Sequence, residues 1–183
     1  MIYVLTGNGK GKTTSAIGMA VRAAGAGKKV LFIQFLKPGD SSEIKALKSI
    51  KDVKIFSFGR PRLLATKQTL LNNPELKRQG VKALAEEDTI LAKQGWQKAK
   101  EALVKNQADM LILDEVSLAL YYQLLDLKEV LDFLKKYGAK KDVVLTGRYC
   151  PKEILELANL VTQMQEIKHP YQKGISQKKG IEF

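Results

Sequence analysis

Residues 6–14 read TGNGKGKTT, and they follow a short apolar run at residues 2–5. The glycines at positions 7, 9 and 11 let the backbone turn sharply, so that successive N–H groups point into one concavity at the start of a helix. The ammonium of Lys12 can reach phosphate oxygens there, and the hydroxyl of Thr13 can hold a Mg²⁺ ion that the phosphates also bind. This segment therefore predicts a phosphate-binding loop between a strand and a helix.

One position departs from the usual pattern G-x-x-x-x-G-K-[ST], which would place glycine where this chain has Thr6. A merely flexible glycine-rich turn is the alternative, but it leaves Lys12 and Thr13 at the matching offset unexplained. The residues that we expect to contact a bound nucleotide through this loop are Gly7, Asn8, Gly9, Lys10, Gly11, Lys12, Thr13 and Thr14.

A second feature of such a site is a carboxylate at the end of another buried strand. Residues 110–115 read MLILDE, an apolar run that ends in Asp114 and Glu115. Either carboxylate can reach Mg²⁺ directly or through water, and the sequence leaves open which one does so. Their alternative role is to cap the helix that follows.

Short apolar, β-branched runs alternate along the chain with longer amphipathic stretches, which is the pattern of a parallel sheet flanked by helices. We therefore predict an α/β fold, with a single P-loop NTPase domain of the RecA-like type over residues 1–183 and a mostly parallel sheet of about six strands. The predicted strands span residues 2–6, 30–35, 53–58, 110–113, 143–146 and 160–167, and a helix is predicted over 13–24.

The middle of the chain carries weaker signals. Asn73, Pro74 and Glu75 form a helix-start signal, and they predict a long helix that runs through the region 84–103. Trp96 in that helix has the spacing of a core residue, although it could also stack on a planar ligand. Residues 59–69 lack a clean period and predict an irregular loop.

The chain carries a net charge of +12 over 183 residues, which favours polyanionic ligands such as nucleotides. Its basic residues are scattered and its aromatic content is 7%, so we prefer an ordinary basic surface over a dedicated nucleic-acid site. A single cysteine, Cys150, excludes an internal disulfide, and no apolar run approaches the ~20 residues of a membrane span. We expect a cytoplasmic protein with no membrane partner.

Four segments, in this order, resemble the P-loop corrinoid adenosyltransferases, the cob(I)alamin or cob(I)yrinic acid a,c-diamide adenosyltransferase family. They are TGNGKGKTTSAIGMAVRAAGAGKKVLFIQFLK, LILDEV, VVLTGRYCPKEILELANLVTQM and KHPYQKGISQKKGIEF, and together they extend over nearly the whole chain. The resemblance implies that the Co(I) centre of a reduced corrinoid attacks the ribose 5′ carbon of ATP and that triphosphate leaves, in the synthesis or salvage of adenosylcobalamin. Charge would then gather on the triphosphate, where Lys10, Lys12 and Mg²⁺ can stabilise it.

The resemblance also implies roles for residues outside the loop. It makes Arg22 a candidate for contact with the nucleoside part of ATP, and Arg148 a second nucleotide contact near the end of a strand. An ordinary surface or core role is the alternative for each of these residues and for each corrinoid candidate. The candidates for the corrinoid are Gln34 and Lys37 at the end of the second strand, Phe56 and Phe58 in the third, and His169.

The resemblance further suggests a homodimer, and a reducing flavoprotein partner is consistent with it. The chain begins almost at its first strand, so we expect it to lack the amino-terminal extension with which many members cover the corrinoid. Two other functions use the same kind of loop. A RecA-like ATPase or nucleic-acid-binding module would release orthophosphate in response to DNA, and a small-molecule kinase would produce ADP.

Overall fold

A six-stranded sheet forms the centre of the molecule, in a computed structural model that describes residues 1–61, 63–168, 178 and 180. Its strands lie in the order β3-β2-β6-β7-β1-β8, and each neighbouring pair is parallel. The predicted α/β class and the six predicted strands are confirmed. The last strand is shorter than the predicted range 160–167. The strands are β1 (Ile2–Thr6), β2 (Val30–Phe35), β3 (Val53–Phe58), β6 (Met110–Asp114), β7 (Asp142–Thr146) and β8 (Leu160–Gln163).

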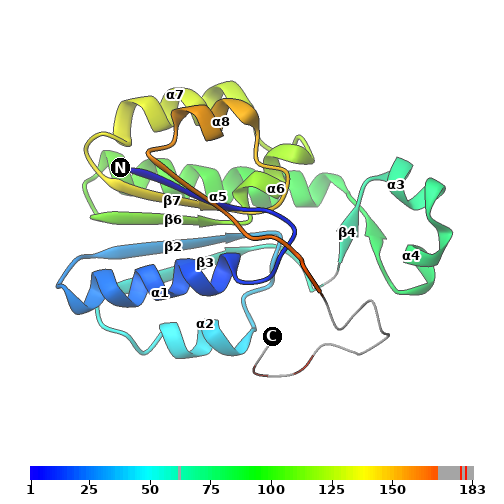
Figure 1. Cartoon of the computed structure of the whole chain (residues 1–183), viewed down its shortest axis with the longest axis horizontal. Helices are drawn as coiled ribbons and strands as arrows, with labels where there is room; N and C mark the ends of the chain where they lie inside the picture. The colour runs from blue at the N-terminus through cyan, green and yellow to red at the C-terminus, as the bar shows by residue number, and fades with distance from the viewer. Residues whose placement is uncertain (62, 169–177, 179, 181–183) are drawn as a thin grey trace.

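Helices cover both faces of this sheet (Figure 1). Helices α1 (Lys12–Gly25) and α2 (Ser42–Leu47) pack on one face, and they share a buried cluster with strands of the sheet. The opposite face is covered by α5 (Glu86–Val104), α6 (Val116–Tyr121), α7 (Leu127–Tyr137) and α8 (Lys152–Leu157). Burial on both faces explains why the central strands are apolar without alternation: all six residues of β2 are buried.

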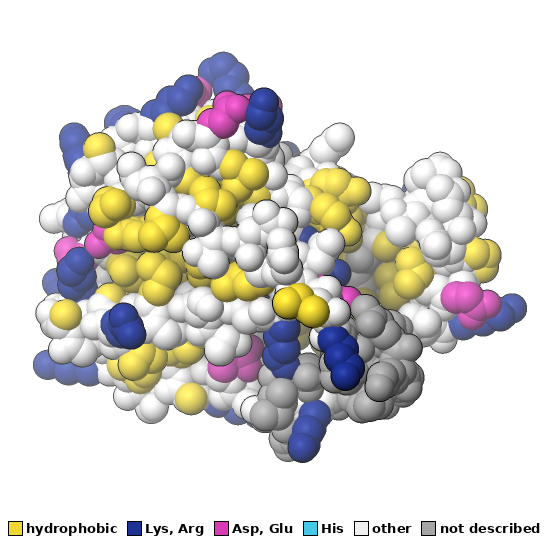
Figure 2. All heavy atoms as spheres, in the orientation of Figure 1, with side chains coloured by type: hydrophobic (Ala, Val, Ile, Leu, Met, Phe, Trp, Pro, Cys, Tyr) yellow, Lys and Arg dark blue, Asp and Glu magenta, His cyan; other side chains and the backbone are white. Residues whose placement is uncertain are grey.

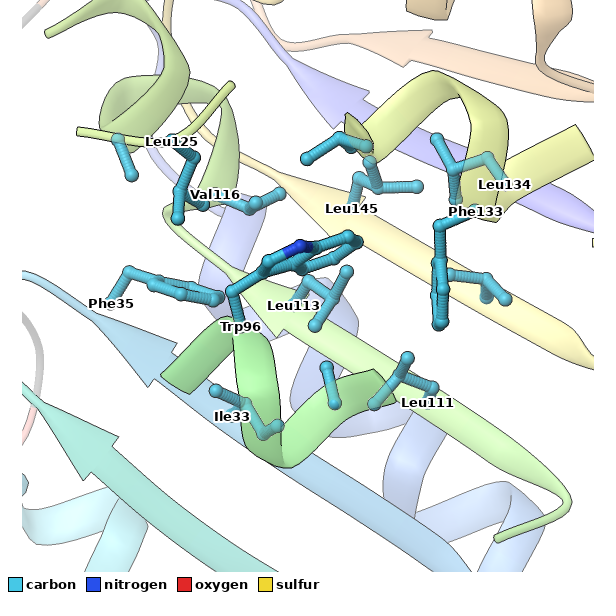
Figure 3. Packing of buried hydrophobic residues seen from close by; sticks show 14 of the residues in the cluster. Ile33, Phe35, Trp96, Leu111, Leu113, Val116, Leu125, Phe133, Leu134 and Leu145 are labelled. Atoms are coloured by element: carbon cyan, nitrogen blue, oxygen red, sulfur yellow. The ribbon is translucent and has the colours of Figure 1, made fainter. Parts of the chain in front are cut away.

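Trp96 of α5 belongs to the core. Its side chain is 3% exposed and meets the ring of Phe133 edge-on, with the ring centroids 4.8 Å apart. Figure 3 shows it among the side chains of Leu113, Leu145 and Phe133, between the sheet and α7. The core interpretation of Trp96 is therefore confirmed over stacking on a ligand.

Gly95, next to it, lets two rings approach α5 without interrupting the helix. A Cβ atom at this position would lie 2.9 Å from the ring of Phe58 and 3.0 Å from the ring of Phe35. Close packing of this kind explains a glycine in a helix interior, where its conformational freedom is otherwise unfavourable.

The single long helix predicted from Asn73 is wrong. Asn73 does precede a helix, but α4 (Pro74–Arg78) ends before Gly80, whose φ of 83° lies in the left-handed region. Strand β5 (Lys82–Ala83) then pairs with β4 (Leu64–Ala65), and only after it does α5 begin.

The irregular loop predicted for residues 59–69 is also wrong in part, because it contains β4 and the start of α3 (Lys67–Asn72). Two-residue strands are too short to show a period in the sequence. The unit formed by α3, α4, β4 and β5 has its own small core of Ala65, Leu70 and Val81. It lies beside the carboxyl ends of the strands of the main sheet (Figure 1).

The basic side chains are spread over the face of the molecule that Figure 2 draws. On the face drawn in Figure 2, lysine and arginine side chains occupy several separate places and do not mass in one patch. In the described part of the chain, no helix combines the length and the apolar character that a membrane crossing requires.

Candidate functional site

The glycine-rich segment forms a loop between β1 and the amino terminus of α1. Gly7 and Gly11 have φ values of 98° and 111°, which glycine adopts without strain. Gly11 occupies the N-cap position of α1, where no side chain of the described residues accepts a capping hydrogen bond. The first N–H groups of the helix, with the positive end of its dipole, are therefore left for an anionic ligand.

The chain that follows β8 packs directly on this loop. The N–H of Gly9 donates to the carbonyl of Met164 at 2.8 Å. A Cβ atom at Gly7 would lie 2.3 Å from the carbonyl oxygen of Met164, and one at Gly9 would lie 2.6 Å from that of Gln165. Both glycines thus allow residues 164–165 to pass close to the loop, a packing role that the sequence pattern did not reveal.

Lys12 is held inside the loop rather than extended into solvent. Its side chain is buried, and Nζ donates to the carbonyl oxygens of Gly7 and Gly9, each at 2.7 Å. Burial lowers the pKa of Lys12, and it outweighs the opposing charge of Glu115. The ammonium is therefore positioned within the concavity of the loop.

Asp114, the last residue of β6, is fully buried and accepts hydrogen bonds from four side chains. One oxygen accepts from the hydroxyls of Thr13 at 2.9 Å and Thr146 at 2.7 Å. The other accepts from Lys37 Nζ at 3.0 Å and Gln34 Nε2 at 3.2 Å. Burial by itself would raise the pKa of Asp114, but the charge of Lys37 and these hydrogen bonds hold it below its ordinary value.

Glu115 differs from its neighbour in both conformation and charge. It has a φ of 61° and occupies the N-cap position of α6, although its side chain makes no capping hydrogen bond within the described structure. Burial, with the charge of Asp114 adding to it, raises the pKa of Glu115. Of the two carboxylates, Asp114 is the one joined to the Thr13 hydroxyl, whereas Glu115 lies 3.8 Å from Lys37 Nζ.

These side chains meet because their strands run parallel and end at one edge of the sheet. Gln34 lies in β2, Asp114 ends β6 and Thr146 ends β7, and β6 lies between β2 and β7. The phosphate loop follows β1, which pairs with β7 on its other side. Ligand sites in open parallel sheets form at this edge, outside the carboxyl ends of the strands.

Among the other predicted nucleotide contacts, Arg148 lies at the loop and Arg22 does not. Arg148 is exposed, and its Nη2 donates to the carbonyl of Asn8 at 3.3 Å. Asn8, Lys10 and Thr14 are exposed on the loop and the first helical turn. Arg22 is exposed in the last turn of α1, about 15 Å along the helix from Lys12.

The corrinoid candidates fall in different places. Phe56 and Phe58 are partly buried and pack against the cluster that contains α5, and Lys98 Nζ lies 4.6 Å from the centroid of the Phe56 ring. Gln34 is fully buried; besides donating to Asp114, it accepts from Ser57 Oγ at 3.2 Å. Lys37 contacts Asp114 and Thr13, and His169 lies outside the described residues.

The sequence analysis did not select Thr146, which binds both acidic positions. Its hydroxyl donates to Asp114, and the same oxygen accepts from the backbone N–H of Glu115 at 3.0 Å. The only feature of the sequence that could have pointed to this residue is its position between the apolar run of β7 and Gly147. An exposed pair, Tyr121 and Tyr149, was also not selected; these rings stack with centroids 4.4 Å apart.

Comparison with known proteins identifies the family of this chain. The family model described as ATP:corrinoid adenosyltransferase BtuR/CobO/CobP matches residues 1–183. The chain belongs to this family. The resemblance found in the four sequence segments is thereby confirmed, and the loop and carboxylates described above are those of a member of the ATP:corrinoid adenosyltransferase family.

Three relatives match along the whole chain. The corrinoid adenosyltransferase of Escherichia coli (strain K12) is 35% identical over 183 residues, which is 100% of this chain and 85% of that protein. Corrinoid adenosyltransferase CobA of Salmonella typhimurium is 34% identical over 183 residues, with the same coverage. The corrinoid adenosyltransferase of a Sinorhizobium species is 34% identical over 187 residues, 100% of this chain and 80% of that protein.

A solved structure with a partial likeness is the flagellar accessory protein FlaH from Methanocaldococcus jannaschii. It has a TM-score of 0.48 and 15% sequence identity, and the match covers 88% of this chain and 69% of that chain. At this level of similarity it adds nothing to the sheet order described above.

Proposed function

We propose that this chain transfers the 5′-deoxyadenosyl group of ATP to the Co(I) centre of a reduced corrinoid and releases inorganic triphosphate, in the synthesis or salvage of adenosylcobalamin. Membership of the ATP:corrinoid adenosyltransferase family supports the reaction class. The geometric observation that carries the proposal is the 2.9 Å hydrogen bond between Thr13 and Asp114, which joins a phosphate loop to a buried carboxylate at one edge of the sheet.

In this reaction the electron pair of Co(I) forms a bond to the ribose 5′ carbon while the bond between that carbon and the triphosphate oxygen breaks. The bonding electrons leave with the triphosphate, so negative charge grows on the leaving group. The buried Lys12 ammonium and the N–H groups at the start of α1 are fixed where they can stabilise this charge. Lys10 is proposed to assist from the exposed side of the loop, together with Arg148.

The residues at the carboxylate edge suit a Mg²⁺ ion, which binds oxygen ligands. The Thr13 hydroxyl and the Asp114 carboxylate are both hard oxygen donors in contact with each other, and Glu115 lies next to them. When bound there, Mg²⁺ would neutralise charge on the phosphate oxygens. Thr146 and Gln34 orient Asp114, because each donates to one of its two oxygens.

Several further properties belong to this proposal. They are one nucleotide-binding domain over residues 1–183, a cytoplasmic location, a homodimer, a reducing flavoprotein partner, contact of Arg22 with the nucleoside, and contact of Phe56, Phe58 and His169 with the corrinoid. The natural acceptor is cobalamin, cobinamide or a biosynthetic precursor, and a test with several corrinoids distinguishes among them.

The test supplies ATP, Mg²⁺ and a panel of chemically reduced corrinoids, and it follows both products. We expect an adenosylated corrinoid and inorganic triphosphate in equal amounts. Formation of ADP would indicate a kinase, and release of orthophosphate stimulated by DNA would indicate a RecA-like ATPase. Failure with every corrinoid in the panel would overturn the proposal.

A further inference from the structure

The ammonium of Lys37 lies among three oxygen atoms of the carboxylate edge. Its Nζ is 3.0 Å from Asp114 Oδ2, 3.0 Å from Thr13 Oγ1 and 3.8 Å from Glu115 Oε1. These are the side chains proposed above to face Mg²⁺. A cation that belongs to the protein therefore already sits at this group of oxygens.

The backbone directs Lys37 into this position. Leu36, just before it, has a φ of 60°, a left-handed conformation that is rare for a leucine and is held here by a 2.9 Å hydrogen bond from its N–H to the carbonyl of Phe58. Gly59 permits the turn, since a Cβ atom there would lie 2.2 Å from the backbone nitrogen of Lys37. The approach of these two strand ends fixes where the lysine side chain begins.

Lys37 binds the same oxygen atoms that a metal ion would use. The Thr13 hydroxyl gives its one proton to Asp114 and accepts from Lys37 with a lone pair. Magnesium–oxygen distances are about 2.0–2.1 Å. A Mg²⁺ ion on Thr13 and Asp114 would thus lie no more than roughly 5 Å from Nζ in its present place, and the two cations would repel each other strongly.

We propose that Lys37 is the resident counter-cation of this site and that Mg²⁺ displaces its ammonium when it binds with the nucleotide. Lys37 then acts as a positioning residue: it holds Thr13 and Asp114 together and opposes binding of Mg²⁺ alone. The lysine side chain is 33% exposed, so its ammonium can move away from the carboxylates toward solvent. This inference rests on the proposed function only in taking the site to bind Mg²⁺ with a nucleotide.

The test compares Mg²⁺ binding by the full chain without nucleotide, at constant ionic strength, by titration calorimetry and by the shift in melting temperature. Lys37→Gln removes the charge but keeps a hydrogen-bond donor for Asp114, and Lys37→Arg keeps the charge. Lys128→Gln is the matched control for net charge, because Lys128 is 84% exposed and pairs with Asp132 on the surface of α7.

We expect Lys37→Gln to bind Mg²⁺ alone at least ~10-fold more tightly than the unmodified protein, because one competing charge has been removed. Lys37→Arg and Lys128→Gln should behave like the unmodified protein. An affinity of Lys37→Gln within about twofold of the unmodified protein would overturn the inference.

If Lys37→Gln is unfolded without metal, recovery of its folded circular dichroism spectrum on addition of Mg²⁺ supports the inference. No recovery with Mg²⁺, while the double variant Lys37→Gln/Asp114→Asn folds, would count against it. Because these readouts involve neither ATP nor corrinoid, they separate the two proposals. Tighter Mg²⁺ binding without any adenosylated product would leave the Lys37 inference standing and remove the transferase reaction.

Discussion

The hydroxyl of Thr13 donates a 2.9 Å hydrogen bond to the carboxylate of Asp114, although 101 positions separate the two residues in the chain. Thr13 belongs to the first turn of α1, and Asp114 ends β6 in the middle of the sheet. This contact joins the phosphate loop to the acidic edge. The loop and the carboxylate can therefore act on one bound nucleotide.

Lys12→Ala should lower kcat/KM for adenosyl transfer by at least ~100-fold, because the ammonium is fixed where charge develops on the leaving triphosphate. The fold should persist, and circular dichroism checks this. Lys128→Ala removes an exposed ammonium and should leave activity unchanged. Near-normal turnover by Lys12→Ala would contradict the role given to the loop.

The stability contributed by Asp114 should depend on pH with a defined sign. Its folded pKa is below the unfolded value of about 3.9. The contribution is therefore fully present above that unfolded pKa and is lost as pH falls through the lower folded pKa. Asp114→Asn should accordingly be less stable than the unmodified protein at neutral pH, with a difference that shrinks below about pH 4.

Urea denaturation in EDTA from neutral to acidic pH measures this difference. Asp132→Asn is the control, since Asp132 is exposed and its pair with Lys128 is open to solvent screening. A penalty for Asp114→Asn that stays constant across the series would argue that the charge of Asp114 is unimportant to the fold.

Thr146→Val should destabilise the protein by about 1–3 kcal/mol, because the part-buried N–H of Glu115 loses its acceptor and the buried Asp114 loses a donor. Valine matches the shape of threonine, so the effect reports the hydrogen bonds. Thr6→Val is the comparison, because the hydroxyl of Thr6 donates to the carbonyl of Gly147 and not to a carboxylate. We expect this variant to lose less stability, about 0.5–1.5 kcal/mol. If both variants lose the same free energy of unfolding, the hydrogen bond from Thr146 to the Asp114 carboxylate contributes no more to stability than the hydrogen bond from Thr6 to a neutral carbonyl.

Gly9→Ala should lower the melting temperature and weaken nucleotide binding. The added methyl group would lie 2.6 Å from the carbonyl oxygen of Gln165, and overpacking of this kind costs about 1–3 kcal/mol. Gly18→Ala is the matched substitution in the middle of α1, where nothing lies within 4 Å, and it should stabilise the helix by up to about 1 kcal/mol. Thermal unfolding and titration with a nonhydrolysable ATP analogue measure both effects.

Short sequence patterns predicted the phosphate loop and the strands of the main sheet, because each of these elements depends on residues that are close together in the chain. The phosphate loop requires glycines and a lysine at fixed spacings, and each buried strand is visible in the sequence as an apolar run. Both kinds of element therefore lie where they were predicted. The region 59–85 was predicted poorly because the helix-start signal at Asn73 says nothing of where the helix ends. The end was decided by Gly80 and by a two-residue pairing of β4 with β5, which leaves no periodic trace.

Among the site residues, Lys12, Thr13 and Asp114 could be chosen from their motifs, whereas Thr146 could not. A threonine at a strand end has no fixed meaning until its neighbouring strand is known. Lys37 was selected as a corrinoid candidate, yet its place beside Asp114 depends on the left-handed turn at Leu36 and on the close passage of Gly59.

The sequence by itself determined that a phosphate loop follows a strand and opens a helix, because backbone turns and helix starts depend on residues a few positions apart. Only the tertiary structure decided that the loop meets Asp114, Thr146 and Lys37. The strand order β2-β6-β7-β1 brings these distant residues to one edge, and that order is set by how the helices pack across the two faces of the sheet, which no local pattern encodes.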